Sequence, residues 1–138
     1  MSFGGDLKKF SSLVEARQTD VLRMAANEVY NSVSVGSDIV GSGKGTPVDI
    51  GNAQNSWRVE DGDAPATGRL EKNHGPEIGL AARASLASMR LGDIKSIIGG
   101  AIYIARLEDG HSKQNQGWVA LTRAAWPRIV QHFVASVK

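Results

Sequence analysis

The sequence contains no cysteine, and this absence excludes disulfide bonds, thiol nucleophiles and zinc–thiolate sites. No apolar run is long enough to cross a bilayer, and the amino terminus lacks the apolar core of a signal peptide. We therefore expect a soluble protein that is made in a cytoplasm and has no membrane partner. Aromatic residues are also few, at 6% of the chain, so the core should rely on Leu, Ile, Val and Ala.

The chain also lacks an excess of charge of either sign. It has 16 Lys and Arg against 14 Asp and Glu, a formal net charge of +2. Basic residues such as Arg58, Lys72 and Arg83 are interleaved with acids, whereas a nucleic-acid groove needs a concentrated basic face. What is present is ordinary for a globular protein, with 41% hydrophobic and 22% charged residues among 138. This composition predicts one domain over residues 1–138.

Two segments have the periodicity of amphipathic helices. The first covers residues 6–34, with Asp6 as a candidate N-cap after a flexible Gly4–Gly5 arm. The second covers residues 118–138, where Pro127 predicts a kink or a restarted helix beside Trp126. Their apolar positions are Leu7, Phe10, Val14, Val21, Met24 or Ala25, and Val29 in the first, and Leu121 or Thr122, Ala125, Ile129, Phe133 and Val137 in the second.

A short helix and a strand are predicted after a Gly/Ser-rich loop over residues 37–45. Asp49 is placed to cap a short helix that runs to about Asn55. Residues 56–60 then alternate as a strand does, with Trp57 and Val59 on one face and Arg58 and Glu60 on the other. Residues 61–75 follow as a second polar loop.

The next segment predicts a middle helix over residues 77–91, which would end at Gly92. Its apolar residues at helical spacing are Leu80, Ala84, Ala87 and Leu91. Residues 94–104 are typical of one or two strands, although a helix starting near Ala101 fits almost as well. The whole pattern indicates an α+β fold, with a long N-terminal helix, a small antiparallel sheet, and a middle helix and a C-terminal helix packed on the sheet.

The residue types that could take part in catalysis or metal binding do not form a convincing site. Gly41 to Thr46 is similar to the end of a phosphate-binding loop, but Asp38 stands where the first glycine belongs and Pro47 follows where a helix should start. No serine lies in a nucleophile elbow. The histidines have no second ligand at metal-binding spacing; they are His74, His111 and His132. The sequence therefore predicts no enzyme, no metal and no cofactor.

The tryptophans leave two interpretations open. Trp57, Trp118 and Trp126 could form the exposed aromatic set of an assembly interface, or each could belong to the core. The stretch from Tyr103 to Gln114 is similarly ambiguous. It combines an apolar run, the acidic pair Glu108–Asp109 and a stop at Gly110, which fits either one or two helical turns or a strand end before a loop.

Two blocks of the sequence resemble those of a known family, the neck proteins of tailed bacteriophages, which are also described as head–tail connector, tail-completion or minor tail proteins. The first block is Thr46-Pro47-Val48-Asp49-Ile50-Gly51 followed by Ser56-Trp57-Arg58-Val59, which is similar to the family's "T-P-V-D-T-G-x-L-x-x-S-W". The second is Ile102-Tyr103-Ile104-Ala105-Arg106-Leu107-Glu108-Asp109-Gly110-His111-Ser112-Lys113-Gln114 with Gly117-Trp118. It is similar to "Y-A-x-x-L-E-x-G-x-S-x-Q" and the Gly–hydrophobic pair that follows it.

The resemblance implies a non-catalytic α+β subunit of a ring, a hexamer or dodecamer, at the junction of head and tail. Its partners would be further copies of itself, the portal or adaptor assembly, and the tail terminator or tail tube proteins. Phage DNA would pass through the lumen without sequence-specific binding. The residues that the resemblance assigns to the two turns and the second loop are Asp49, Gly51, Trp57, Tyr103, Leu107, Glu108, Gly110, His111, Ser112, Lys113 and Gln114.

Within this interpretation, the loops over residues 37–45 and 61–75 are expected to be disordered in the free subunit and to order against neighbours. Two other functions stay open. A tail terminator, which caps the tail tube, would occupy the same part of the virion. A small DNA-binding protein belongs to another class and would require a basic face.

Overall fold

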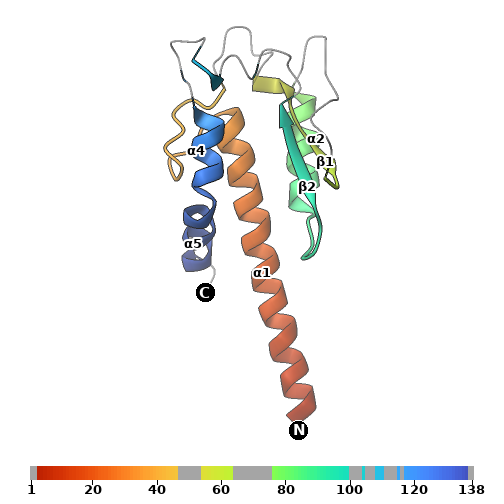
Figure 1. The fold of residues 1–138 in the computed structure, drawn as a ribbon. Helices are drawn as coiled ribbons and strands as arrows, with labels where there is room; N and C mark the ends of the chain where they lie inside the picture. Colours follow the sequence, from red (N-terminus) through yellow and green to blue (C-terminus); the bar gives the residue numbers. More distant parts are fainter. Residues whose placement is uncertain are drawn as a thin grey trace.

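One long helix forms the axis of the molecule, and the other elements pack around its C-terminal half (Figure 1). The structure is a computed structural model that describes residues 3–46, 54–63, 76–99, 104, 108–110, 115 and 117–136. The elements are α1 (Phe3–Ser34), the 3-10 helix η1 (Gln54–Ser56), β1 (Trp57–Asp61), α2 (Glu77–Ala87), β2 (Lys95–Gly99), α4 (Trp118–Ala124) and α5 (Trp126–Ser136). The predicted α+β fold with a long N-terminal helix is confirmed.

Helix α1 begins earlier than the sequence indicated. It starts at Phe3 and runs through Gly4 and Gly5, so the prediction of a flexible arm before an Asp6 N-cap is wrong. Asp6 instead lies in the first turn, where its carboxylate faces the positive end of the helix dipole. Two glycines weaken a helix by only about 1 kcal/mol each, which the continuous helix downstream can offset.

The two strands form an antiparallel pair in which Val59 lies opposite Ile97. The predicted alternation of β1 is confirmed. Trp57 belongs to a buried cluster against which Val59 packs, while the side chain of Arg58 pairs with Glu60 at 2.8 Å. Helix α2 separates the strands in sequence and packs against β1. Residues 47–53, which include the predicted Asp49 cap, lie outside the described residues.

Helix α2 differs from its prediction in length and in the face that it buries. It ends at Ala87 rather than near Leu91, with Ser88 as its C-cap. Its buried residues are Ala82 and Leu86, whereas Leu80 is 70% exposed. In an alanine-rich helix several faces are similarly apolar, so periodicity alone does not select the one that the tertiary structure covers.

The C-terminal segment consists of two helices, because the chain breaks at Ala125 and restarts at Trp126. This outcome agrees with the predicted restart beside Pro127, which lies in the first turn of α5, where a missing N–H is tolerated. Helix α5 packs along α1. The C-terminal segment reaches the buried side of the sheet through Trp118 of α4, which shares a cluster with Trp57.

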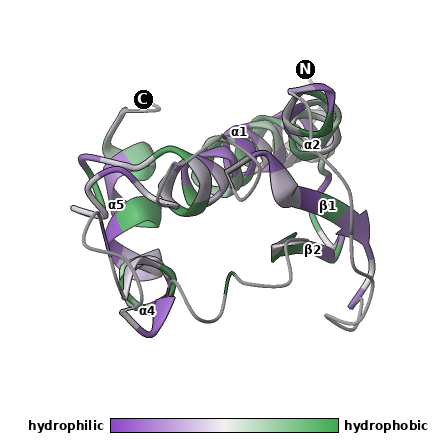
Figure 2. Cartoon of the chain, turned by 90° about the horizontal axis from the view of Figure 1, so that it is seen from above, coloured by the Kyte–Doolittle hydropathy of each residue, from purple (hydrophilic) through white to green (hydrophobic). Residues whose placement is uncertain are grey.

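The core consists of two apolar clusters on either side of α1, and Figure 2 shows α1 between the sheet and the C-terminal helices. The larger cluster joins α1 to the sheet and α2 and contains Ala26, Tyr30, Val33, Trp57, Ala82, Leu86, Met89, Ile104 and Trp118. The smaller joins α1 to α5 and contains Ala25, Val40, Ala125 and Ile129. Within the described ranges, no helix is both long and apolar enough to span a bilayer.

Candidate interaction surface

The C-terminal end of α1 is the point where distant parts of the sequence meet. A helix leaves its last four carbonyl groups without partners inside the helix. At the end of α1, the Val33 carbonyl accepts hydrogen bonds from Thr46 Oγ1 at 2.6 Å and from Trp118 Nε1 at 3.0 Å. The indole Nε1 of Trp57 in turn donates to Thr46 Oγ1 at 2.6 Å. Both indole N–H groups, although buried, are therefore satisfied at one helix end.

The Gly/Ser loop supplies the other bonds that this helix end requires. Ser42 Oγ donates to the Ser32 carbonyl at 3.2 Å, and the Thr46 N–H donates to the Ser34 carbonyl at 3.3 Å. The Asn31 carbonyl accepts the N–H of Gly36 at 2.7 Å. The segment from Gly41 to Thr46, whose sequence is similar to part of a phosphate-binding loop, is thus a cap for the C-terminus of α1, not an anion site.

A buried network of hydroxyl groups ties the loop to α4. Ser32 Oγ donates to Ser42 Oγ at 2.9 Å and lies 2.6 Å from Thr122 Oγ1, which itself donates to the Trp118 carbonyl. Asn115 also fixes the loop, since its Nδ2 donates hydrogen bonds to the carbonyls of Ser42 and of Gly45.

These bonds overturn the expectation that the loop over residues 37–45 is disordered in the free subunit. Thr46, which ends the loop, is fully buried, and Ser42 is nearly so. The buried hydroxyl groups of Ser37, Ser42 and Thr46 form hydrogen bonds inside the subunit, whereas Asp38 and Lys44 are exposed. Of the loop over residues 61–75, only residues 61–63 lie within the described residues.

Among the predicted site residues, the structure describes Trp57, Glu108 and Gly110, and the first two have structural roles. Trp57 is in the core. Glu108 Oε2 accepts the N–H of Val119 at 2.8 Å, and its carbonyl accepts the N–H of Gly117. Glu108 thereby caps α4, whose N-cap residue has no side chain to do so.

Gly110 lies in a turn with φ of 102°, which agrees with its predicted role as a stop. Eight predicted residues lie outside the described residues: Asp49, Gly51, Tyr103, Leu107, His111, Ser112, Lys113 and Gln114. Trp57 and Glu108 therefore contribute to the structure of the subunit itself.

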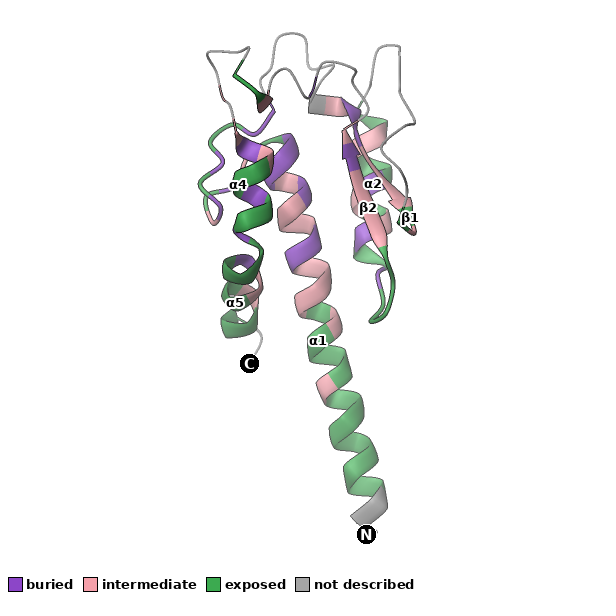
Figure 3. Cartoon of the chain, viewed as in Figure 1, coloured by how far each residue is buried: buried purple, intermediate pink, exposed green. Residues whose placement is uncertain are grey.

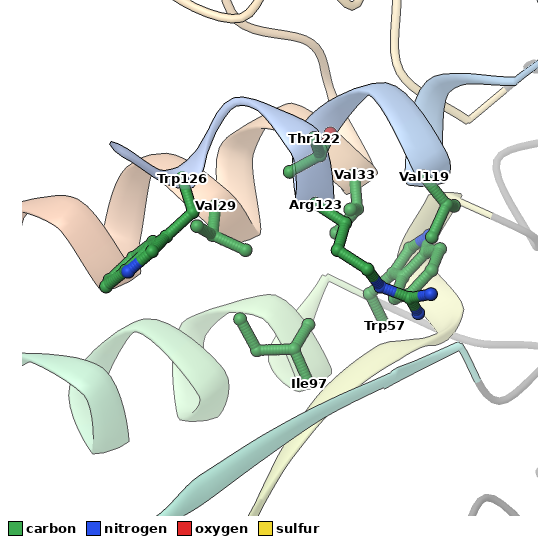
Figure 4. Close-up of a pocket in the computed structure, with 8 residues that line it drawn as sticks. All are labelled: Val29, Val33, Trp57, Ile97, Val119, Thr122, Arg123 and Trp126. Atoms are coloured by element: carbon green, nitrogen blue, oxygen red, sulfur yellow. The ribbon is translucent and has the colours of Figure 1, made fainter. Parts of the chain in front are cut away.

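One such surface is an apolar hollow between α4 and the sheet, with a volume of about 300 Å³ (Figure 4). Trp57 and Val33 lie at its base, and Arg123 and Trp126 are exposed at its rim. Among the described residues, its lining is Val29, Val33, Trp57, Ile97, Val119, Thr122, Arg123 and Trp126. The sequence left open whether the three tryptophans are core residues or an exposed aromatic set. Trp57 and Trp118 are buried in the core, whereas Trp126 is 41% exposed.

A second surface is the N-terminal half of α1, which stands clear of the other elements (Figure 3). Leu7, Phe10 and Leu13 are exposed there, and Phe10 is 66% exposed. Leu7 and Phe10 are among the apolar positions predicted for this helix. Periodicity does not reveal how far the packed elements extend along α1, so it does not indicate that these side chains are exposed.

Tyr30 is a buried titratable group with a shifted pKa. Burial raises the pKa of Tyr30 above its ordinary value of 10.0, and the Arg83 guanidinium over its ring partly opposes this shift. The Tyr30 hydroxyl donates to the Trp57 carbonyl at 2.7 Å. His132 is exposed on α5. In the part of the chain that the structure describes, no three His, Asp or Glu side chains gather where they could hold a metal ion.

Comparison of the chain with family models, with curated proteins and with solved structures found no match.

Proposed function

We propose that the protein is a structural subunit of a tailed-phage virion, forming a homo-oligomeric ring at the head–tail junction. In this role it joins the portal or adaptor assembly to the tail and performs no catalysis. DNA passes through the ring, and a subunit with a net charge of +2 and mixed signs does not bind it strongly.

The observation that carries the proposal is the meeting of the two family-like blocks at the end of α1. Thr46 and Trp57 belong to the first block, and Trp118 closes the second. All three join one hydrogen-bonded group at the Val33 carbonyl. Residues that build a shared fold are expected to recur across a family. Their structural use here supports the interpretation that both blocks come from the same family pattern.

The second support is the pair of apolar surfaces that the subunit leaves uncovered, the hollow beside α4 and the N-terminal half of α1. A subunit that works alone gains nothing from exposing Phe10 and Trp126, whereas a subunit of an assembly buries such side chains against neighbours.

The test is electron microscopy of particles made by a phage that carries this gene with an early stop codon. Filled heads beside separate tails of normal length are the expected result for a head–tail joining protein. Heads with overlong or irregular tails would instead indicate a tail terminator. Intact, infectious particles would contradict both virion roles.

A binding measurement separates the proposal from the DNA-binding alternative. The purified protein should bind duplex DNA weakly, without sequence preference, and lose that binding as salt is added. Tight binding with a steep dependence on salt concentration would reveal many phosphate contacts and would favour a DNA-binding protein.

A further inference from the structure

The two uncovered apolar surfaces are complementary in shape. Leu7, Phe10 and Leu13 lie within an arc of roughly 120° on α1 and so form one ridge, called here the α1 ridge. Phe10 is the most exposed of the three. The hollow beside α4 is concave and apolar, and its volume of about 300 Å³ suits one large side chain better than a whole helix.

The ridge and the hollow cannot meet within one molecule. Both Phe10 and Val29, which lines the hollow, belong to the continuous helix α1. Nineteen residues separate them, and a helix rises 1.5 Å per residue, so they are about 28 Å apart along one axis. A contact between the ridge and the hollow therefore requires two molecules.

One pair of opposite charges supports a second copy as that partner. Of the described residues that line the hollow, Arg123 alone is charged, and it is exposed at the rim. Asp6 lies one turn before Phe10 on the same side of α1, and it is exposed. When Phe10 enters the hollow of another copy, Asp6 is therefore placed to approach Arg123, and Trp126 can cover a leucine of the ridge.

We propose that the α1 ridge of one copy docks in the hollow of the next, with Phe10 as the inserted side chain and Asp6 paired with Arg123. The two contacting surfaces differ, so the interface is heterologous. A heterologous contact repeats from copy to copy until it closes into a ring or continues as a filament. The contact stands on the geometry of the subunit, and its closure into a ring rests on the proposed function.

The test uses the full chain and sedimentation velocity, with far-ultraviolet circular dichroism as the check on folding. The wild type should form a closed oligomer, whereas Phe10→Glu and Trp126→Glu should each be monomeric. Both side chains are exposed, and Glu is favourable in the first turn of α5, so both variants should fold. Leu80→Glu is the control, because Leu80 is about as exposed as Phe10 but lies on α2, outside both surfaces.

Mixing the two monomeric variants is the decisive step. The Phe10→Glu chain keeps an intact hollow and the Trp126→Glu chain keeps an intact ridge, so one contact can form. The mixture should therefore yield a 1:1 dimer and no larger species. If two α1 ridges paired with each other instead, Trp126→Glu would still assemble by itself, the mixture would contain no heterodimer of the two variants, and the proposal would be wrong.

The charged pair has its own test. Asp6→Arg and Arg123→Asp should each weaken association, by up to about fivefold for an exposed pair. Combining the two changes in one chain should restore association. If the double variant associated as weakly as the single variants, Asp6 and Arg123 would not be paired in the interface.

The docking proposal and the proposed function can fail separately. If the wild type stays monomeric at its highest soluble concentration, or Phe10→Glu still forms the wild-type oligomer, the docking contact is refuted while the microscopy result stands. If the Phe10→Glu variant is monomeric but phage lacking the gene are intact, the contact holds and the virion role fails.

Discussion

At the scale of single residues, Thr46 connects the two halves of the subunit. Its hydroxyl donates to the Val33 carbonyl and accepts the Trp57 indole N–H, and the residue is fully buried. A buried polar group that loses its partner pays the full cost of leaving water. Thr46 should therefore matter more for its oxygen than for its methyl group.

Thr46→Val keeps the shape of the side chain and removes that oxygen, so the Trp57 N–H loses its acceptor. We expect the free energy of unfolding to fall by about 1–3 kcal/mol. Thr46→Ser is the matched control, because it keeps the hydroxyl and loses one methyl group, at a cost of about 1 kcal/mol. Urea denaturation measures both. A larger loss for the serine variant would show that packing, not hydrogen bonding, dominates at this site.

Tyr30 gives the stability of the protein a dependence on alkaline pH. Burial favours the neutral phenol, so the pKa in the folded state lies above the ordinary value of 10.0. The unfolded chain releases this proton first as pH rises. The stabilisation is complete below pH 10.0 and is lost as pH rises through the pKa of the folded state.

The free energy of unfolding should therefore fall more steeply above pH 10.0 in the wild type than in Tyr30→Phe, which cannot ionise at this position. Urea denaturation at a series of alkaline pH values measures the two slopes. All other titratable groups are common to both proteins, so their contributions cancel in the difference. Parallel slopes would mean that Tyr30 titrates alike in the folded and unfolded chains.

At the scale of elements, the segment from Gly36 to Thr46 acts as an extended cap of α1. Gly36 begins it with φ of 108°, a conformation that favours glycine. A Cβ at this position would overlap the carbonyl oxygen of Gly43, because the backbone at Gly36 and the backbone at Gly43 lie too close together for any side chain.

Gly36→Ala should consequently destabilise the protein much more than Gly41→Ala. Gly41 also has positive φ, but nothing lies within 4 Å of its added Cβ. The control should lose about 1–2 kcal/mol from backbone strain alone, and Gly36→Ala should lose at least about 2 kcal/mol more. Thermal denaturation of both variants measures the difference. Equal losses would mean that the loop opens to accept the methyl group at little cost.

Helix α1 contains two parts with different support. Ala25, Ala26, Tyr30 and Val33 are buried among other elements, whereas Leu7, Phe10 and Leu13 are exposed. Short helices without tertiary contacts are marginal in water, because packing supplies most of the stability of a helix. The two ends of this one helix should therefore open independently.

Hydrogen exchange measures this difference directly. In a monomeric variant, such as Phe10→Glu, amides of residues 7–18 should exchange far faster than those of residues 25–34. In the assembled wild type, the first group should become protected and the second should change little. Slow exchange in residues 7–18 of the monomer would show that the free end is stable by itself.

At the scale of the whole molecule, the proposed assembly depends on apolar burial more than on charge. The net charge is only +2, and the docking contact includes a single charged pair at its rim. Salt screens exposed pairs and leaves apolar contacts largely unaffected.

Raising the sodium chloride concentration to about 0.5 M should therefore change the association constant by less than about tenfold. Sedimentation velocity at low and high salt measures the change, with Arg123→Gln as the control that removes the rim pair. The variant should be even less sensitive to salt than the wild type. Complete dissociation of the wild type by salt would point to an interface built on charges.

The sequence by itself determined the elements whose signals are local. The long first helix, the alternation of Trp57 to Glu60, the restart beside Pro127 and the stop at Gly110 each depend on periodicity or on the backbone preferences of proline and glycine. The absence of cysteine likewise excluded thiol chemistry without any structure.

Only the tertiary structure decided which faces are covered and where polar groups find partners. It placed Leu86 rather than Leu80 in the core, and it made the segment similar to a phosphate-binding loop a cap through bonds from Ser42 and Thr46 to α1. Glu108 and Val119 likewise meet across eleven positions of sequence. Burial and capping depend on contacts between residues far apart in the chain, and a local pattern carries no information about how those segments approach each other.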